Sequence, residues 1–396
     1  MARTKENGMK KLWLVLFAMV LALLMVGCDQ SGGASQGEGK PSVGLEFKSN
    51  GDGTCSVVGR GECTDTDVVI PAMSPEGDTV TSIGASAFAR CNDLTSVTIP
   101  NGVKTIGAEA FSGCHALSNV VIPDGVTSIG ASAFSVCRCL RSITLPDSVT
   151  SIGASAFFRC LTLNNITIPV GVKTIEAETF SGCRSLSNIT IPVGVKTIGA
   201  EAFSECLSLK QVTIPDGVTS IGSAAFRQCM ELESLVLPDS VVTIGAEAFK
   251  DCIRLSSLNI PPLVYTLESG VFDNCINLMQ TENGVTYIDK WVYRCDRSVT
   301  SVTLRADTVG IALFAFYGCG EMTDIEIPKT VLNIGNSAFG KCDSLTSVTY
   351  VGTQAEWNML VRIVPSLPAE LGDDCVIHCT DGDITPKGEP VEAPQS

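Results

Sequence analysis

Cysteine is the residue type whose number and spacing in this chain most suggest chemistry. The sequence contains 18 cysteines, and eleven fall in one column: nine stand 23 residues apart and two resume the pattern later. The column is Cys91, Cys114, Cys137, Cys160, Cys183, Cys206, Cys229, Cys252, Cys275, Cys319 and Cys342. Stacked repeats aim equivalent side chains in one direction, so their Cβ atoms do not converge as a disulfide requires. We therefore predict buried, reduced thiols that bond weakly to nearby carbonyl groups.

Other chemically capable residues are few and scattered. Disulfides or reactive thiols are expected only outside the column, at Cys55, Cys63, Cys139, Cys295, Cys375 and Cys379. Zinc at Cys375, His378 and Cys379 would lack a fourth nearby ligand, and the other histidine, His115, is far away in the sequence. The pair Asp381 and Asp383 around a glycine is typical of a turn rather than a calcium site.

Motifs of catalysis are missing from the sequence. It contains no Ser, His and acid set, nucleophile elbow, phosphate loop or HExxH helix. The sequence therefore predicts a protein that is not an enzyme and that carries no metal and no cofactor.

The column cysteines belong to a repeated stretch whose clearest copy is LTSVTIPNGVKTIGAEAFSGCHA, residues 94–116. A fixed period of this length indicates a solenoid in which each copy stacks on its neighbours. Leu94, Val97 and Ile99 predict a short strand with its apolar residues turned inward. Pro100 ends the strand because proline lacks the amide hydrogen that a ladder needs.

The second half of the copy predicts a turn. Gly107 recurs at its position in most copies, which suggests a backbone angle that side chains resist. The segment AEAFSGC is too short for a long helix, so we expect a helical or 3₁₀ turn that directs Ala110, Phe111 and Cys114 inward.

The full pattern, LxxVxIPxxVxxIGxxAFxxC, resembles the BspA-like class of bacterial leucine-rich repeats. This resemblance implies a leucine-rich repeat horseshoe of about 13 repeats, with a parallel β-sheet on the concave face and helical or 3₁₀ turns on the convex side. It also implies a life outside the cytoplasm on bacterial surfaces, and adhesion as the function.

The N-terminus indicates export. Residues 1–27 combine basic residues with an apolar run that ends before Cys28, and Leu24 to Cys28 resemble a lipobox. By that resemblance Cys28 carries the lipid; an ordinary secretory peptide with an incidental cysteine is the alternative. Residues 28–42 are polar and rich in Gly and Ser, which predicts a flexible tether. The expected location is the bacterial cell envelope, on the outer surface or the periplasmic face.

The remaining chain divides by pattern into four parts. We predict an N-terminal β-hairpin cap at 43–62, a repeat array at 63–349 with an irregular unit at 279–298, a C-terminal capping unit at 350–379 and a disordered tail at 380–396. The formal net charge of −15 disfavours nucleic acid as a partner, because the surface repels phosphate.

Ligand contacts are expected where the strands face outward and where the repeat fails. Neutral polar residues line the strands, among them Asn119, Asn165, Asn188 and Gln211, and the irregular unit adds Tyr287, Trp291, Tyr293 and Arg294 as anchors. The predicted function is binding of a protein or glycan, including host extracellular matrix or other cells. The alternative is a structural or self-associating envelope lipoprotein without an external ligand.

Overall fold

The structure is a computed structural model that describes residues 39–391. The predicted signal segment 1–27, Cys28, the first part of the predicted tether and the last five residues lie outside the described residues. The chain divides into two compact units, one ending at Ile189 and one beginning at Thr190. Each unit is a stack of repeats, which confirms the predicted repeat solenoid.

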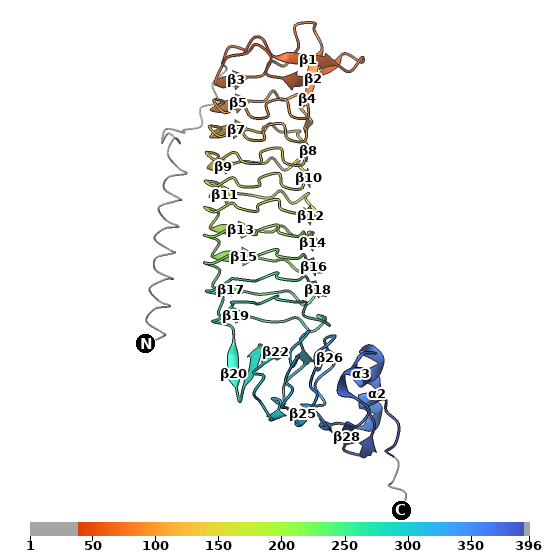
Figure 1. Cartoon of the computed structure of the whole chain (residues 1–396). Helices are drawn as coiled ribbons and strands as arrows, with labels where there is room; N and C mark the ends of the chain where they lie inside the picture. Colours follow the sequence, from red (N-terminus) through yellow and green to blue (C-terminus); the bar gives the residue numbers. More distant parts are fainter. Residues whose placement is uncertain (1–38, 392–396) are drawn as a thin grey trace, which may run out of the picture. The chain divides into compact units, whose positions relative to one another are not determined.

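Each repeat of unit 1 contributes two short strands, which stack into two columns of parallel strands (Figure 1). The first column holds the predicted LxxVxI strands: β3 (Asp67–Val69), β5 (Ser96–Thr98), β7 (Asn119–Val121), β9 (Ser142–Ile143), β11 (Asn165–Ile166) and β13 (Asn188–Thr190), the last ending on the first residue of unit 2. The second column was not predicted: β4 (Thr79–Ile83), β6 (Thr105–Ile106), β8 (Ser128–Ile129), β10 (Ser151–Ile152) and β12 (Thr174–Ile175). Neighbouring strands pair one repeat apart, as Ser96 with Asn119 and Thr105 with Ser128.

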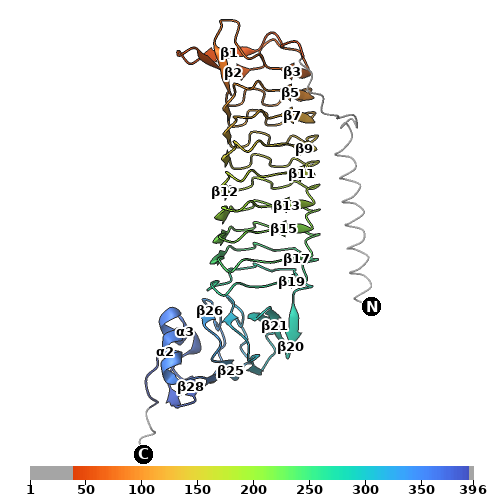
Figure 2. The ribbon, with the colours of Figure 1, turned by 180° about the vertical axis from the view of Figure 1, so that it is seen from behind.

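Unit 2 also has two columns of short strands, and a hairpin is inserted between its repeats. Its first column is β15 (Gln211–Thr213), β17 (Ser234–Leu235), β19 (Ser257–Leu258), β23 (Ser301–Thr303), β25 (Asp324–Pro328) and β27 (Ser347–Val351), and Figure 2 shows β15, β17 and β19 from behind. Its second column is β14 (Thr197–Ile198), β16 (Ser220–Ile221), β18 (Thr243–Ile244), β24 (Gly310–Ile311) and β26 (Asn333–Ile334). The irregular unit forms an antiparallel meander of β20 (Gln280–Glu282), β21 (Val285–Ile288) and β22 (Trp291–Cys295).

The segment AEAFSGC is not helical, which corrects the expected helical or 3₁₀ turn. Glu109 and Gly113 have φ values of 56° and 75°, and a left-handed residue interrupts a right-handed helix. The segment is instead a run of turns in which alternate amides bond inside the repeat and to the next one. Ser112 N donates to Glu109 O at 3.0 Å, whereas Phe111 N donates to Ala133 O at 2.8 Å. These outward amides form a third column of hydrogen bonds between repeats.

Gly107 is required for close packing rather than for an unusual backbone angle. It does not have a positive φ, and a Cβ built on it would lie 2.7 Å from the backbone nitrogen of Ala85 in the preceding repeat. The same contact recurs between Gly130 and Ala108, where the distance is 2.5 Å. The expected reason for this glycine was therefore wrong: a side chain would push two stacked backbones apart.

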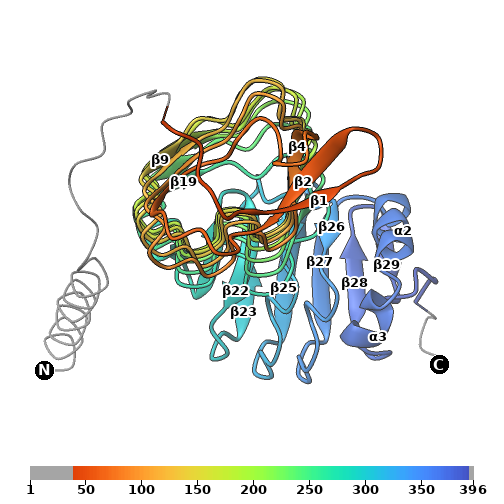
Figure 3. The same cartoon turned by 90° about the horizontal axis from the view of Figure 1, so that it is seen from above.

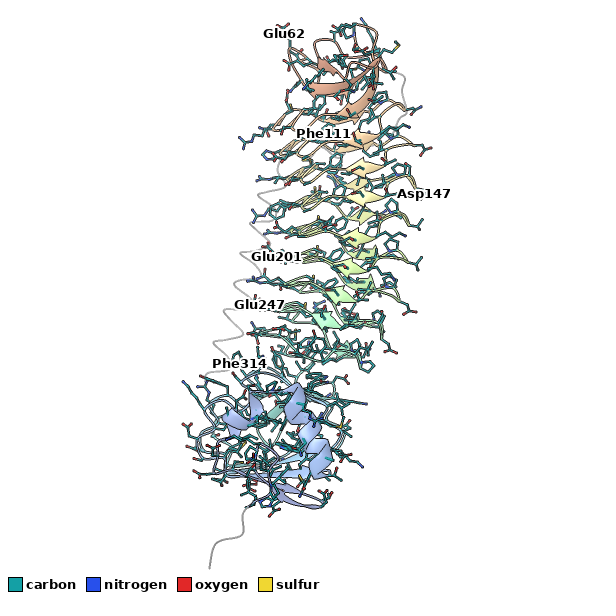
Figure 4. All side chains as sticks on the ribbon, turned by 90° about the vertical axis from the view of Figure 1, so that its right-hand side faces the viewer. Glu62, Phe111, Asp147, Glu201, Glu247 and Phe314 are labelled. Atoms are coloured by element: carbon teal, nitrogen blue, oxygen red, sulfur yellow. The ribbon has the colours of Figure 1, made fainter. Side chains whose placement is uncertain are left out.

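Phenylalanine fills the core of each unit. The rings of Phe88, Phe111, Phe134, Phe157 and Phe180 stack in unit 1 with centroids 5.3–5.7 Å apart and nearly parallel planes. Unit 2 repeats the arrangement at Phe203, Phe226, Phe249 and Phe272, and again at Phe316 and Phe339. Figure 4 places Phe111 within the stack, and all of these rings are buried. Stacking therefore buries the apolar side chains of each repeat against those of the next repeat, away from solvent.

The two ends of the described chain close differently. In unit 1, β1 (Glu46–Ser49) and β2 (Thr54–Gly59) form an antiparallel pair, and β2 also pairs in parallel with β4. In unit 2, β27 is followed by α2 (Gln354–Ile363), α3 (Leu367–Leu371), β28 (Val376–Cys379) and β29 (Gly382–Ile384), with β28 and β29 continuing the first column (Figure 3).

The strand β29 corrects the expected start of the disordered tail. Residues 382–384 pair antiparallel with β28, as His378 with Asp383, and Ile384 is buried. The sequence TDGDI has few apolar residues, so its pairing depends on an edge that only the folded repeat array supplies.

Candidate functional site

The cysteine column is a structural ladder. Eight of its thiols donate to the carbonyl oxygen of a phenylalanine 26 residues earlier, at 3.0–3.3 Å: Cys114, Cys137, Cys160, Cys183, Cys229, Cys252, Cys275 and Cys342. The cysteines of this column are reduced, as predicted. Burial raises the pKa of Cys114 and of Cys160 to about 12, because a thiolate is poorly solvated in an apolar interior. Such thiols are poor nucleophiles.

The cysteines of the C-terminal strands are also unsuited to chemistry. Burial raises the pKa of both Cys375 and Cys379 to about 11. His378 Nδ1 lies 2.9 Å from Asp383 Oδ1 across the β28–β29 pair, so the imidazole has a carboxylate partner. Asp381 Oδ1 accepts from Gln354 N at 2.8 Å, at the start of α2. Within residues 39–391, no group of three or more His, Cys, Asp or Glu side chains could hold a metal ion.

The aromatic residues of the irregular unit lie in the core, which corrects their expected role as ligand anchors. Tyr287 and Trp291 are 2% exposed and Tyr293 is 8% exposed. Arg294 alone among these four candidates is exposed, and its Nη2 lies 3.6 Å from Met279 Sδ. Aromatic side chains suit a core as well as a binding surface, and the sequence contains no signal that separates the two cases.

Each of these rings has a structural task. Trp291 lies over Gly310 of β24, where a Cβ would approach its ring to 2.5 Å. The ring of Tyr287 is covered by the guanidinium of Arg305, whose carbon lies 4.1 Å from the ring centroid. Tyr293 packs edge-on against Phe272 at 6.1 Å and ends the phenylalanine stack. The irregular unit thus joins two runs of regular repeats.

The outward strand positions are exposed, as a binding face requires. Asn165 and Asn188 in unit 1 and Gln211 in unit 2 are exposed, and Asn119 is half-buried. Among the described residues, no hydrogen bond engages the side-chain amides of Asn119, Asn165 or Gln211, whereas Asn188 Nδ2 donates to Ser187 Oγ at 3.2 Å. The first strand column therefore presents neutral donors and acceptors to solvent.

One exposed aromatic cluster is not predicted by the sequence pattern. Phe314 is 48% exposed, has a φ of 60° and packs edge-on against Tyr317 at 5.6 Å. Lys341 Nζ lies 5.4 Å from the centroid of the Tyr317 ring. Figure 4 places Phe314 on the edge of unit 2 along which Glu201 and Glu247 also lie. Polar residues, alanine or glycine occupy the Phe314 position in the other repeats, and this difference could have identified it.

Comparisons with known proteins agree with the geometry of the repeat. The model of the BspA type leucine rich repeat region, with six copies, matches residues 66–184, 150–279 and 276–357. No curated protein matches the chain. No helix among residues 39–391 is long and apolar enough to cross a membrane.

Several solved structures are similar to the chain. A leucine-rich repeat protein of T. pallidum is 30% identical, with a TM-score of 0.46, and the match covers 49% of this chain and 90% of that one. One from Bacteroides ovatus is 22% identical, with a TM-score of 0.49, covering 85% and 98%. A leucine rich cell surface protein from Faecalibacterium prausnitzii is 28% identical, with a TM-score of 0.42, covering 84% and 98%.

Proposed function

The chain belongs to the BspA-type leucine-rich repeat family, and from this membership we propose that it binds a protein or glycan ligand at the bacterial cell envelope. The binding is non-catalytic. The observation that carries the proposal is the first strand column, where Ser142, Asn165 and Asn188 in unit 1 and Gln211, Ser234 and Ser257 in unit 2 are exposed, neutral and polar. Adhesion to host extracellular matrix or to other cells is the role that such a surface would serve.

The spacing of this strand face suits an extended ligand. Strands in the column pair in register, so Asn165 lies beside Ser142 and Ser96 lies beside Asn119. Paired strands are about 4.8 Å apart, so the polar groups repeat at that interval along the column. A polysaccharide or an extended peptide can accept and donate hydrogen bonds at regular intervals. Neutral groups also bind without a strong dependence on salt, in contrast to a charged surface.

Two further features supplement the strand face. Arg294 is exposed on β22 and could bind a carboxylate or sulfate of a ligand. Phe314 and Tyr317 supply the aromatic area that the strand face lacks, and aromatic residues dominate the energetics of many binding surfaces. We assign the primary contacts to Asn119, Asn165 and Asn188 in unit 1 and to Gln211 in unit 2.

The proposal includes an N-terminal lipid anchor at Cys28. The support is the lipobox-like sequence before Cys28 and the polar tether after it. Replacing Cys28 by Ala should abolish acyl labelling of the protein in cells. Labelling that persists would refute the anchor. Protease treatment of intact cells would then distinguish the outer surface, where the repeats are cleaved, from the periplasmic face, where they are protected.

The binding proposal is tested with a matched pair of exposed substitutions in unit 1. The secreted chain is applied to a panel of immobilised extracellular-matrix proteins and to a glycan array. Asn165→Lys places a long charged side chain on the first strand column, and Ser151→Lys places the same side chain on the second column. We expect Asn165→Lys to weaken binding about tenfold or more, which corresponds to a loss of about 1.4 kcal/mol in binding free energy. Ser151→Lys should leave the affinity unchanged.

The outcomes separate the two functions. If both variants lose binding equally, or if neither loses any, the ligand contacts do not lie on the first column. If no member of either panel binds and the chain associates with itself in analytical ultracentrifugation, the structural, self-associating function replaces the proposed one.

A further inference from the structure

An unassigned pair of thiols lies where the irregular unit meets the next regular repeat. Cys295 ends β22, and Cys319 belongs to the repeat that contains β24. Both are reduced, and the thiol of each shifts the pKa of the other. Cys295 is half-buried and packs against the core cluster that contains Cys319. The pair is independent of the binding face described above.

The repeat geometry explains why these two side chains meet. In a regular repeat the amide of phenylalanine bonds to the next repeat, as Phe111 N does to Ala133 O at 2.8 Å, and the thiol of Cys137 lies on the carbonyl of that phenylalanine. In the irregular unit Cys295 takes this place, since Cys295 N donates to Ala315 O at 2.8 Å. Cys295 therefore has the backbone position that a phenylalanine has in a regular repeat.

The column thiol of the next repeat is displaced as a result. Cys319 donates to the carbonyl of Asp296 at 3.7 Å, a longer contact than the 3.2 Å between Cys137 and Phe111. Asp296 is the neighbour of Cys295 in the chain, so the thiol of Cys319 points at the segment that carries the second thiol. Column cysteines are 23 residues apart, but this pair is 24 apart, which moves Cys295 out of the parallel register.

Charges around the pair favour reaction. The thiol of Cys295 and the nearby guanidinium of Arg297 hold the pKa of Cys319 below its ordinary value, although the carboxylate of Asp296 opposes this. The guanidinium is close to this turn, because a Cβ on Gly318 would lie 3.5 Å from Arg297 Nε. A stabilised thiolate next to a second thiol is the arrangement that thiol–disulfide exchange requires.

We propose that Cys295 and Cys319 are a site of thiol–disulfide exchange, at which a low-molecular-weight disulfide converts the two thiols into an intrachain disulfide. Cys295 is the more exposed thiol, whereas Cys319 is buried. The neighbouring thiol of Cys319 raises the pKa of Cys295, so the thiolate of Cys319 accepts the proton of Cys295 while the sulfur of Cys295 attacks the small disulfide and releases one small thiol. The sulfur of Cys319 then attacks the mixed disulfide, forms the Sγ–Sγ bond and releases the second small thiol. The two cysteines together lose two protons and two electrons, which the small disulfide takes up.

The chain contains a matched control in the pair Cys252 and Cys275. These thiols donate to the carbonyl oxygens of Phe226 and Phe249, and both are 0% exposed and belong to the regular column. Burial raises the pKa of Cys252 well above its ordinary value. A small disulfide reaches neither sulfur, so this pair should stay reduced while the native protein is oxidised.

The test is oxidation of the full, folded chain with oxidised glutathione. The product is denatured, alkylated with N-ethylmaleimide, digested with trypsin and examined by mass spectrometry. Trypsin cleaves after Arg294, Arg297 and Arg305, so Cys295 and Cys319 lie on separate peptides. We expect a linked peptide pair that is about tenfold or more abundant than any link between the control cysteines and that disappears on treatment with dithiothreitol.

Two variants test the assigned order of attack. Cys319→Ser should accumulate a glutathione adduct on Cys295, because the resolving thiol is missing, and Cys295→Ser should give neither adduct nor link. Full alkylation of both cysteines in the oxidised wild-type chain would overturn the proposal, as would a lasting glutathione adduct on Cys295 in the wild type. An equal yield of the Cys252–Cys275 link would also overturn it. If a variant fails to fold, the measurement on the wild-type chain still decides whether the Cys295–Cys319 disulfide forms.

Discussion

Glu370 on α3 binds the amide of Phe339 in the last regular repeat. Its Oε2 accepts from Phe339 N at 3.1 Å, and its Oε1 accepts from Ser337 N at 2.8 Å. In other repeats the equivalent amides bond to carbonyl groups of the following repeat, as Phe111 N and Glu109 N do to Ala133 O and Ala131 O. The carboxylate of Glu370 thus supplies the two hydrogen-bond acceptors that the carbonyl groups of a following repeat would supply.

This relationship predicts that Glu370→Ala destabilises unit 2. Two amides would lose their acceptor, and an unsatisfied buried polar group costs about 1–3 kcal/mol, so we expect a loss of about 2–4 kcal/mol. Glu370→Gln keeps one acceptor oxygen and should cost about half as much. Urea unfolding followed by circular dichroism measures both. Glu321→Ala is the control, because Glu321 is exposed and makes no hydrogen bond among the described residues. An equal loss of stability in this control would contradict the role of Glu370 as acceptor for the two amides.

Tyr293 performs the same task inside unit 2, where the irregular unit interrupts the column. Its hydroxyl accepts from Phe272 N at 3.2 Å and donates to Asp273 Oδ1 at 2.9 Å. Tyr293→Phe should cost about 1–3 kcal/mol, because it leaves the Phe272 amide without an acceptor. The exposed Tyr265→Phe is the control. Hydrogen exchange at Phe272 should become faster in the first variant only, and unchanged protection would refute the role of the hydroxyl.

The buried thiols predict a loss of stability in alkaline solution. Burial raises the pKa of Cys160 from the ordinary 9.0 to about 12, so the folded state keeps the proton that the unfolded state releases. Stability is therefore fully present below pH 9.0 and is lost as pH rises towards about 12, by up to about 1.4 kcal/mol per pH unit for each such thiol.

Cys160→Ala tests this linkage directly. The variant should be less stable than the wild type at neutral pH, because it loses packing and the 3.1 Å bond to Phe134 O. Its stability should nevertheless fall less steeply between neutral pH and a pH midway between the two pKa values. Urea unfolding at both pH values measures the slope. An identical slope in the two proteins would show that this thiol ionises equally in the folded and unfolded states.

Val136 predicts a stabilising substitution. It has a φ of 60°, whereas glycine occupies the equivalent positions 113 and 182 and asparagine occupies position 274. A β-branched residue is strained in this left-handed conformation, which asparagine tolerates. Val136→Asn should therefore raise stability by about 1 kcal/mol. Val170→Asn is the control, since Val170 is 62% exposed and does not have a positive φ. Equal changes in melting temperature would argue against relief of strain.

The sequence by itself determined the repeat, because each position of the copy meets the same neighbours one period later. The period of 23 residues was enough to predict the inward strand residues and the reduced thiol column. The resemblance to a known family rested on the same residues. Local pattern also predicted that Asn165 and Gln211 would be exposed on their strands.

Only the tertiary structure decided the roles of residues in the irregular unit and at the end of the repeat array, where the repeat pattern is interrupted. Tyr293 and Trp291 have residue types that suit a surface or a core, and their burial depends on Phe272 and Gly310, which the chain brings to them after folding. Glu370 meets Phe339 across 31 residues, and no local signal marks either partner. In a regular repeat the backbone amides find carbonyl acceptors in the next repeat. At the ends of a run of repeats no such acceptors follow, so side chains that the repeat pattern does not predict must bind these amides.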